Sequence, residues 1–198
     1  MKVLYIILIL GFSMHFAKAD PTLPNKVRVV IDPGYSESNT DDSSNALLEQ
    51  QLVADVSSQL KAFCKAKNIE IIILQPDSEL MSIQDKIKQI ETFSPDLVIS
   101  LNATYSTDRD RNGVEVFVAK NNHTDKSSYF GNKIIESFKV KDFKTTALQS
   151  ANFYLLKNLN CPAVSVELGF LFHEEDMKYL NSDFGQKFLA KQIATSLD

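Results

Sequence analysis

Short apolar runs alternate with longer amphipathic stretches along this chain, and the alternation predicts strands separated by helices. The apolar runs predict buried strands at residues 27–31, 69–74, 96–101, 114–119, 153–156 and 164–170. Apolar residues at helical spacing predict helices at residues 46–67, 82–93, 125–138 and 174–197, the last broken near 182–185. Ser82 is expected to cap its helix, because Asp85 follows three residues later.

This order of elements predicts an α/β fold. Strands that alternate with helices form a mostly parallel, twisted sheet with helices on both faces, so we expect three αβα layers. Residues 20–198 contain no internal repeat and no Gly/Ser-rich linker. They are therefore interpreted as a single domain with one sizeable core.

Residues 1–19 have the pattern of a secretory signal peptide. Lys2 precedes an apolar run over residues 3–12, and Ala17-Lys18-Ala19 is a small-x-small cleavage site. The run is too short for a membrane span, and no second run of spanning length follows. We expect an exported product, periplasmic or extracellular, that starts at Asp20.

The net charge limits the classes of binding partner, and the two cysteines raise the question of a disulfide. The formal net charge is −4, and loss of Lys2 and Lys18 with the signal peptide lowers it by two, to −6. An acidic chain argues against binding nucleic acid, whose phosphates require a basic face. Export permits a disulfide between Cys64 and Cys161, but both lie in apolar contexts, so we expect two buried free thiols instead.

Four polar residues fall where the predicted strands end or the first long helix begins. Tyr35 follows the first strand, Glu49 begins the helix, Asn102 follows the third strand and Glu167 ends the last one. The carboxyl ends of parallel strands meet at one edge of a sheet, and ligands bind there, so we predict that these residues share a cleft. The alternative for Glu167 is a structural role, as a cap or as the partner of a surface lysine.

Several short motifs of this chain match landmarks of one known family. They are residues 29–34 (Val-Val-Ile-Asp-Pro-Gly), 80–83, 96–101, 113–117 and 162–171, together with Glu49 at the head of the first long helix. Through these motifs residues 27–197 resemble the zinc-dependent N-acetylmuramoyl-L-alanine amidases of bacterial cell-wall turnover, in their type 3 catalytic domain, with Lys86 where the family usually has an arginine. The resemblance implies an amidase-like (phosphorylase/hydrolase-like) fold and a peptidoglycan or muropeptide ligand.

The resemblance also implies a metal site, from which this chain departs. In the family two histidines and a glutamate hold Zn²⁺, and a second glutamate, at the place of Glu167, acts as general base and acid on the bound water. Here Glu49 remains, but Tyr35 and Asn102 replace the two histidines. A phenol and an uncharged amide are poor zinc ligands at neutral pH, so we expect no bound metal or other cofactor. Tyr35 and Asn102 can instead donate hydrogen bonds to Glu49 and Glu167.

The other histidines are weak substitutes for the missing ligands. His15 belongs to the signal peptide, and His123 is interpreted as a solvated loop residue. His173 is expected at the start of the last helix near the rim of the site, where ligation would require a rearranged loop.

Three hypotheses follow. The first is a catalytically inactive amidase-like domain that still binds peptidoglycan fragments or a cell-envelope protein. The second is an active amidase that hydrolyses the bond between N-acetylmuramic acid and L-alanine with an unusual metal site of Glu49, Glu167 and His173. The third is a structural or regulatory envelope protein that uses its outer helices.

Overall fold

The structure is a computed structural model that describes residues 26–34, 43–75, 81–106, 108–140 and 143–198. The predicted signal peptide and Tyr35 lie outside the described residues. Both cysteines are buried and free, as predicted. Among the described residues, no helix has the length and apolar character needed to cross a membrane.

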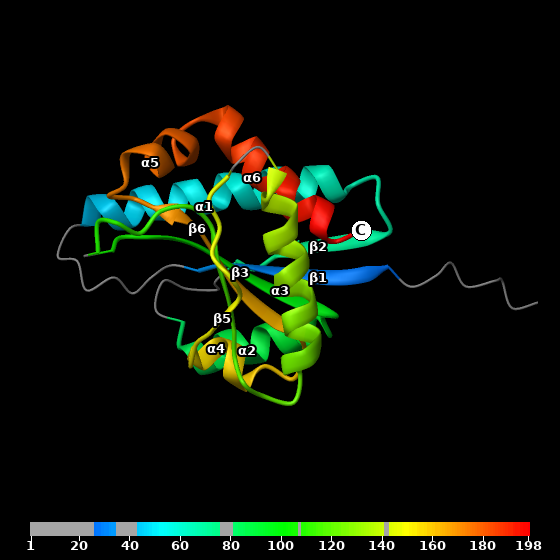
Figure 1. Cartoon of the computed structure of the whole chain (residues 1–198). Coiled ribbons are helices and arrows are strands. Elements are labelled where there is room, and N and C mark those ends of the chain that lie inside the picture. The colour runs from blue at the N-terminus through cyan, green and yellow to red at the C-terminus, as the bar shows by residue number, and fades with distance from the viewer. Residues whose placement is uncertain (1–25, 35–42, 76–80, 107, 141–142) are drawn as a thin grey trace, which may run out of the picture.

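Six strands form one sheet in the order β2-β1-β3-β6-β4-β5 (Figure 1). Neighbouring strands among β1, β2, β3 and β6 are parallel, whereas β4 runs antiparallel to β6 and parallel to β5. The mostly parallel sheet is therefore confirmed. The strands are β1 (Val27–Pro33), β2 (Ile69–Ile73), β3 (Leu97–Thr104), β4 (Glu115–Val118), β5 (Gln149–Ser150) and β6 (Ala163–Phe170).

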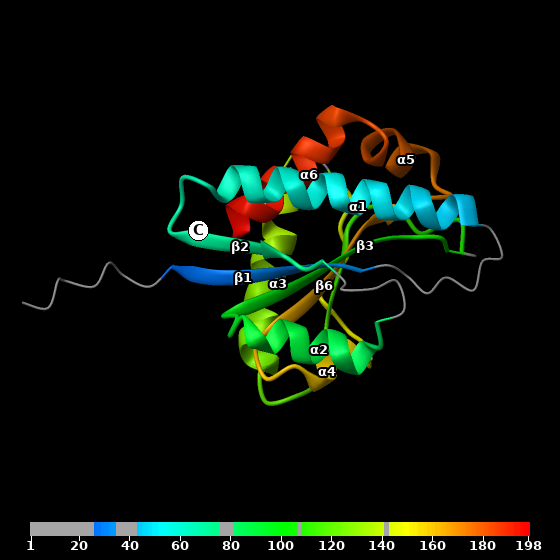
Figure 2. The same cartoon turned by 180° about the vertical axis from the view of Figure 1, so that it is seen from behind.

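Helices cover both faces of the sheet, which confirms the three layers. The helices of the first face are α1 (Ser43–Cys64), α3 (Thr124–Phe138) and α6 (Asp183–Ser196), with α5 (Glu174–Leu180) beside α6. The shorter helices α2 (Ile83–Thr92) and α4 (Tyr154–Asn158) pack on the other face over a smaller apolar cluster (Figures 1 and 2). This second face is incompletely covered, and the candidate site lies there.

Two of the predicted helix boundaries are confirmed by their caps. The Ser82 hydroxyl accepts a hydrogen bond from the Asp85 backbone N–H at 3.1 Å and begins α2. The break in the last helical stretch separates α5 from α6, and the Ser182 hydroxyl accepts from the Gly185 N–H at 3.0 Å. Both are short polar side chains that satisfy otherwise unpaired N–H groups of a first helical turn.

The strand predicted at residues 153–156 is wrong, because this segment begins helix α4. Leu155, Leu156 and Leu159 are buried, and this spacing places all three on one side of a helical turn. A window of four residues could not distinguish that pattern from a buried strand. The error matters for the site, since α4 supplies part of its apolar wall.

Asn102 and Glu167 also differ from their predicted places at strand ends. β3 continues past Asn102 to Thr104, and β6 continues past Glu167 to Phe170. Both side chains therefore come from within paired strands: Asn102 is paired with Glu167 of β6, and Glu167 is paired on its other side with Glu115 of β4. This position fixes their direction more firmly than a loop would.

Candidate functional site

Side chains of three adjacent strands form two polar rows on the less covered face of the sheet. Asn102 of β3, Glu167 of β6 and Glu115 of β4 are register partners and form one row. Ser100 and Ser165 are paired in the row two residues earlier on the same face. Because side chains alternate between the two faces of a strand, these polar side chains share one face of the sheet. The side chains on the opposite face are apolar.

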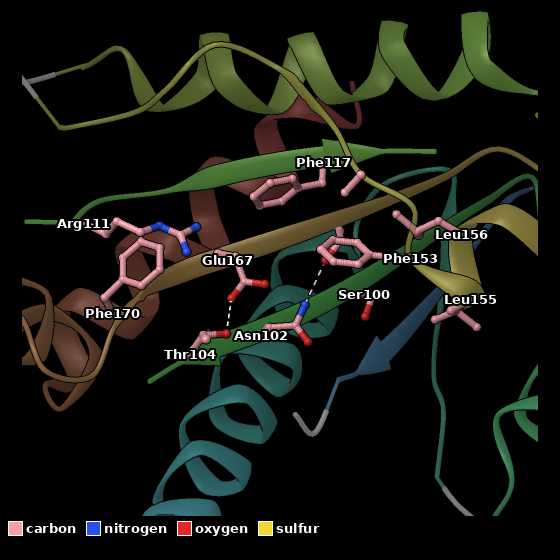
Figure 3. A pocket seen from close by; sticks show the side chains of 12 residues that line it. Ser100, Asn102, Thr104, Arg111, Phe117, Phe153, Leu155, Leu156, Glu167 and Phe170 are labelled. Carbon is pink, nitrogen blue, oxygen red and sulfur yellow. Dashed lines mark hydrogen bonds between the residues drawn. The ribbon is translucent and has the colours of Figure 1, made fainter. Parts of the chain in front are cut away.

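Ser100, Asn102, Ser165 and Glu167 of these rows line one wall of an open cavity of about 540 Å³, a size typical of ligand sites. Thr104 and Arg111 continue the polar side toward the carboxyl ends of the strands, with the Phe170 ring beside Arg111 (Figure 3). The rest of the lining is apolar and consists of Phe117, Ala151, Phe153, Leu155 and Leu156, of which Phe117 is the β4 neighbour of Ser165. The cavity thus has a polar and an apolar part.

The hydroxyl and amide groups of the polar wall are bonded to one another. The Asn102 side-chain amide donates to the Ser165 hydroxyl at 3.0 Å, and Thr104 donates to a Glu167 oxygen at 2.5 Å (Figure 3). Ser100 donates to the buried Asp32 carboxylate at 3.1 Å. The expected bond between Asn102 and a glutamate is thus replaced by one to Ser165.

One cation lies among the carboxylates of this wall. The Arg111 guanidinium contacts both carboxylate oxygens of Glu115 and lies over the Phe170 ring, 4.5 Å from its centroid. Glu115 is buried and also accepts from Gln149 at 3.4 Å. A paired arginine of this kind keeps its charge and a fixed orientation.

Burial raises the pKa of the Glu167 carboxyl above its ordinary value, and the nearby Glu115 acts in the same direction. The hydrogen bond from Thr104 and the positive charge of Arg111 oppose the increase without cancelling it. Burial and Glu115 therefore both disfavour the Glu167 anion, and a cationic partner would stabilise it.

This raised pKa gives a test based on stability. Below pH 4 the carboxyl is protonated in both the folded and the unfolded protein, and as pH rises through the higher folded pKa, burial of the anion lowers the free energy of unfolding. Glu167→Gln should therefore stabilise the protein near pH 7 by about 1 kcal/mol and have little effect near pH 4. Urea unfolding followed by circular dichroism measures both values. The exposed Glu175→Gln is the matched control, and a Glu167→Gln effect independent of pH contradicts the prediction.

The structure brings together two of the four predicted site residues. Asn102 and Glu167 are register partners that line the cavity. Glu49 is buried in α1, a helix that packs on the opposite face of the sheet, and it does not line the cavity. Tyr35 lies outside the described residues, so its role and that of Glu49 stay predictions.

The histidines have other partners. His173 precedes α5 as expected, and its Nε2 lies 2.7 Å from the Asn112 side-chain nitrogen, while Nδ1 lies 3.8 Å from an Asp176 oxygen. His123 precedes α3, and its backbone N–H donates to the Asn121 side chain. Neither histidine lines the cavity.

Several cavity residues were not predicted from the sequence. Ser165 and Thr104 were detectable, because each is two residues from a predicted site residue on the same strand and must share its face. Arg111 had no such signal, since it belongs to a polar loop without periodicity. The apolar wall was hidden by the wrong assignment of residues 153–156.

The sequence matches a known family over nearly all of the described residues. Residues 29–198 match Amidase_3, described as N-acetylmuramoyl-L-alanine amidase. The chain belongs to this family. The amidase CwlM of Bacillus licheniformis is 26% identical over 175 residues, which cover 86% of this chain and 67% of that protein.

Solved amidase structures have the same fold. An N-acetylmuramoyl-L-alanine amidase from Clostridium difficile 630 superimposes with a TM-score of 0.76 at 22% identity, over 87% of this chain and 95% of that one. The CwlD amidase from Clostridioides difficile, solved in complex with the GerS lipoprotein, has a TM-score of 0.71 at 19% identity, over 86% and 95% of the two chains. The three-layer sheet is therefore the fold of this amidase family.

Proposed function

We propose that this protein is an exported, catalytically inactive member of the amidase family that binds peptidoglycan fragments in the cavity. The observation that carries the proposal is the chemistry of position 102. An asparagine stands where the family resemblance expects a zinc histidine, and its amide is bonded to Ser165. Binding needs a shaped cavity and a few polar groups, whereas amide hydrolysis also needs an activated nucleophile.

The residues present fit a zinc ion poorly. Zinc sites take imidazole, thiolate or carboxylate ligands, and an amide is a weak donor for this ion. Among the described residues no group of three or more His, Cys, Asp or Glu side chains is arranged to hold a metal. Of the acids at family positions, Glu167 lines the cavity and Glu49 does not. We therefore derive no catalytic step through a metal.

The cavity keeps features that a binding protein needs. Asn102, Ser165 and Glu167 are fixed within paired strands, and helix α4 supplies Leu155 and Leu156 to the apolar part of the lining, so much of the cavity's shape is set by the fold itself. A preformed site loses little conformational entropy on binding. The cell-wall role of the relatives and the predicted signal peptide support an extracellular or periplasmic location.

Binding of an envelope protein is the second candidate. It is favoured by exposed aromatic side chains at the α5–α6 corner, where Phe184 is 71% and Tyr179 38% exposed. The complex of the CwlD relative with a lipoprotein gives a precedent for a protein partner in this fold. This candidate predicts that purified cell wall alone is not bound.

Elemental analysis and a hydrolysis assay test the proposal on residues 20–198. The purified protein should contain no stoichiometric zinc and should release no peptide from purified muropeptides, with or without added Zn²⁺. It should still sediment with insoluble peptidoglycan. Ala151→Phe, which fills the cavity, should reduce this sedimentation at least about fivefold, because it occupies space that the ligand needs. Metal-dependent release of peptide would refute the proposal.

A further inference from the structure

Three side chains of the polar wall donate hydrogen bonds within the protein. Asn102 donates to Ser165, Ser100 donates to Asp32, and Thr104 donates to Glu167. The bond from Thr104 satisfies one oxygen of Glu167, and the ionised carboxylate of this residue can only accept further hydrogen bonds. A ligand that brings a hydrogen-bond donor to Glu167 suits this part of the wall better than one that brings an acceptor.

Glu167 is the acceptor with the most capacity left. Its Oε2 accepts from Thr104, while Oε1 has no hydrogen-bond partner among the described residues. Its side chain points into the cavity (Figure 3). An ionised carboxylate has room for about four hydrogen bonds, so Oε1 can accept one from a ligand.

The charges near the polar wall also favour a ligand that brings hydrogen-bond donors, in particular a cation. Arg111 is the cation among the cavity-lining residues that the structure describes, and its guanidinium pairs with the two oxygens of Glu115 and lies over the Phe170 ring. Glu115 and Glu167 face each other as register partners on adjacent strands. One guanidinium thus stands against two carboxylates, and an ionised Glu167 leaves the site with an excess negative charge.

The apolar wall adds a second requirement. Phe153 is 41% exposed and packs edge-on against Phe117 with 5.4 Å between ring centroids, and Leu155 and Leu156 extend the same surface. An apolar group placed there would displace water from the neighbouring polar wall. Removal of water strengthens the attraction between opposite charges. The favoured ligand carries an ammonium group next to a small apolar group.

We propose that the cavity binds the free amino terminus of a short peptide that begins with L-alanine, in preference to the same peptide acylated on that nitrogen. This inference rests on the proposed function, because an active amidase would have to bind the acylated form. An ammonium brings three donors and a positive charge to Glu167, whereas an amide brings one donor and no charge.

The reaction that active family members catalyse produces a peptide with a free amino terminus. Hydrolysis of an N-acetylmuramoyl-L-alanine bond places the hydroxyl of water on the acyl carbon and its proton on the nitrogen, which leaves the carboxylic acid and a peptide with a free amine. An inactive family member with this cavity would therefore bind the amine product of active amidases. Its ligand-bound state would indicate that active amidases had cleaved the cell wall.

Isothermal titration of residues 20–198 tests the inference with three probes at pH 6.5, where the amine is charged. The probes are L-alanyl-D-isoglutamine, its N-acetyl derivative and the same dipeptide with N-acetylmuramic acid on its amine. We expect the free amine to bind at least about tenfold tighter than either acylated probe. Glu167→Gln should remove this preference, whereas Glu175→Gln on exposed α5 should keep it.

The outcomes separate the inference from the proposed function. Equal binding of all probes, or tighter binding of the acylated ones, overturns the inference and leaves an inactive binding protein. Hydrolysis of the N-acetylmuramoyl probe overturns both. Binding of none of the probes overturns the inference, and sedimentation with peptidoglycan then decides the proposed function. Thermal unfolding of both variants confirms that they are folded at the titration temperature.

Discussion

Replacing Tyr35→His and Asn102→His together should increase zinc affinity at least about 10³-fold over the wild-type chain and produce measurable amidase activity. Outer partners of metal ligands alone change affinity by roughly 10–100-fold, so two direct ligands should have a larger combined effect. The family resemblance provides Glu49 as a third ligand and Glu167 as the base. Competition with a chromophoric chelator measures zinc affinity, and release of peptide from muropeptides measures activity.

The surroundings of position 102 suit this exchange. The Asn102 side chain is partly exposed to the cavity, and its replacement costs one hydrogen bond to Ser165, about 1 kcal/mol. Gly34 lies against it so closely that an added Cβ would be 2.0 Å from the Asn102 amide oxygen. Because residue 35 directly follows Gly34 in sequence, the two new imidazoles would be attached to neighbouring backbone.

Matched variants separate a restored site from adventitious binding. Each single histidine substitution should bind zinc much more weakly than the pair, and Glu49→Gln in the double variant should weaken binding again. Glu167→Gln in the same background should abolish hydrolysis and leave zinc bound. A folded double variant without increased zinc affinity would contradict the view that only ligands were lost.

The sequence could predict the position of a site residue where the topology of the strands determines it, but not where the register between strands does. Asn102 and Glu167 were placed together because both lie near the carboxyl ends of parallel strands, a relation fixed by topology. The hydrogen-bond partners were not predicted, because they depend on register. The pairing of β3 with β6 shifts between Asn102 and Thr104, and no sequence pattern indicates that irregularity.

The elements of the fold were predictable where their patterns were long. The helices α1, α3 and α6 have apolar faces of three turns or more, and the central strands have β-branched runs that only a buried sheet accommodates. Short elements failed: α4 spans five residues and β5 two, and both form through tertiary packing at the edge of the cavity. Arg111 likewise depends on long-range contacts with Phe170.

Asp176 joins three segments beside the cavity. Its carboxylate accepts from the Gly113 N–H at 3.0 and 2.9 Å and from the Phe170 N–H at 2.8 Å, and all these groups are buried. Gly113 follows the loop that carries Arg111, and Phe170 ends β6 beneath the same guanidinium. The acid of α5 therefore holds the backbone on both sides of the Arg111–Phe170 contact.

Asp176→Ala should lower the free energy of unfolding by about 3–4 kcal/mol, because it leaves two buried N–H groups without an acceptor, at about 1–3 kcal/mol each. Asp176→Asn keeps one acceptor oxygen and should lose about 1–2 kcal/mol. Urea unfolding followed by circular dichroism suits a chain without tryptophan. Glu175→Ala, exposed on the same helix, should change stability by less than about 0.5 kcal/mol. Equal losses for Ala and Asn would indicate that charge rather than acceptor geometry holds the three segments, and that result would contradict this account.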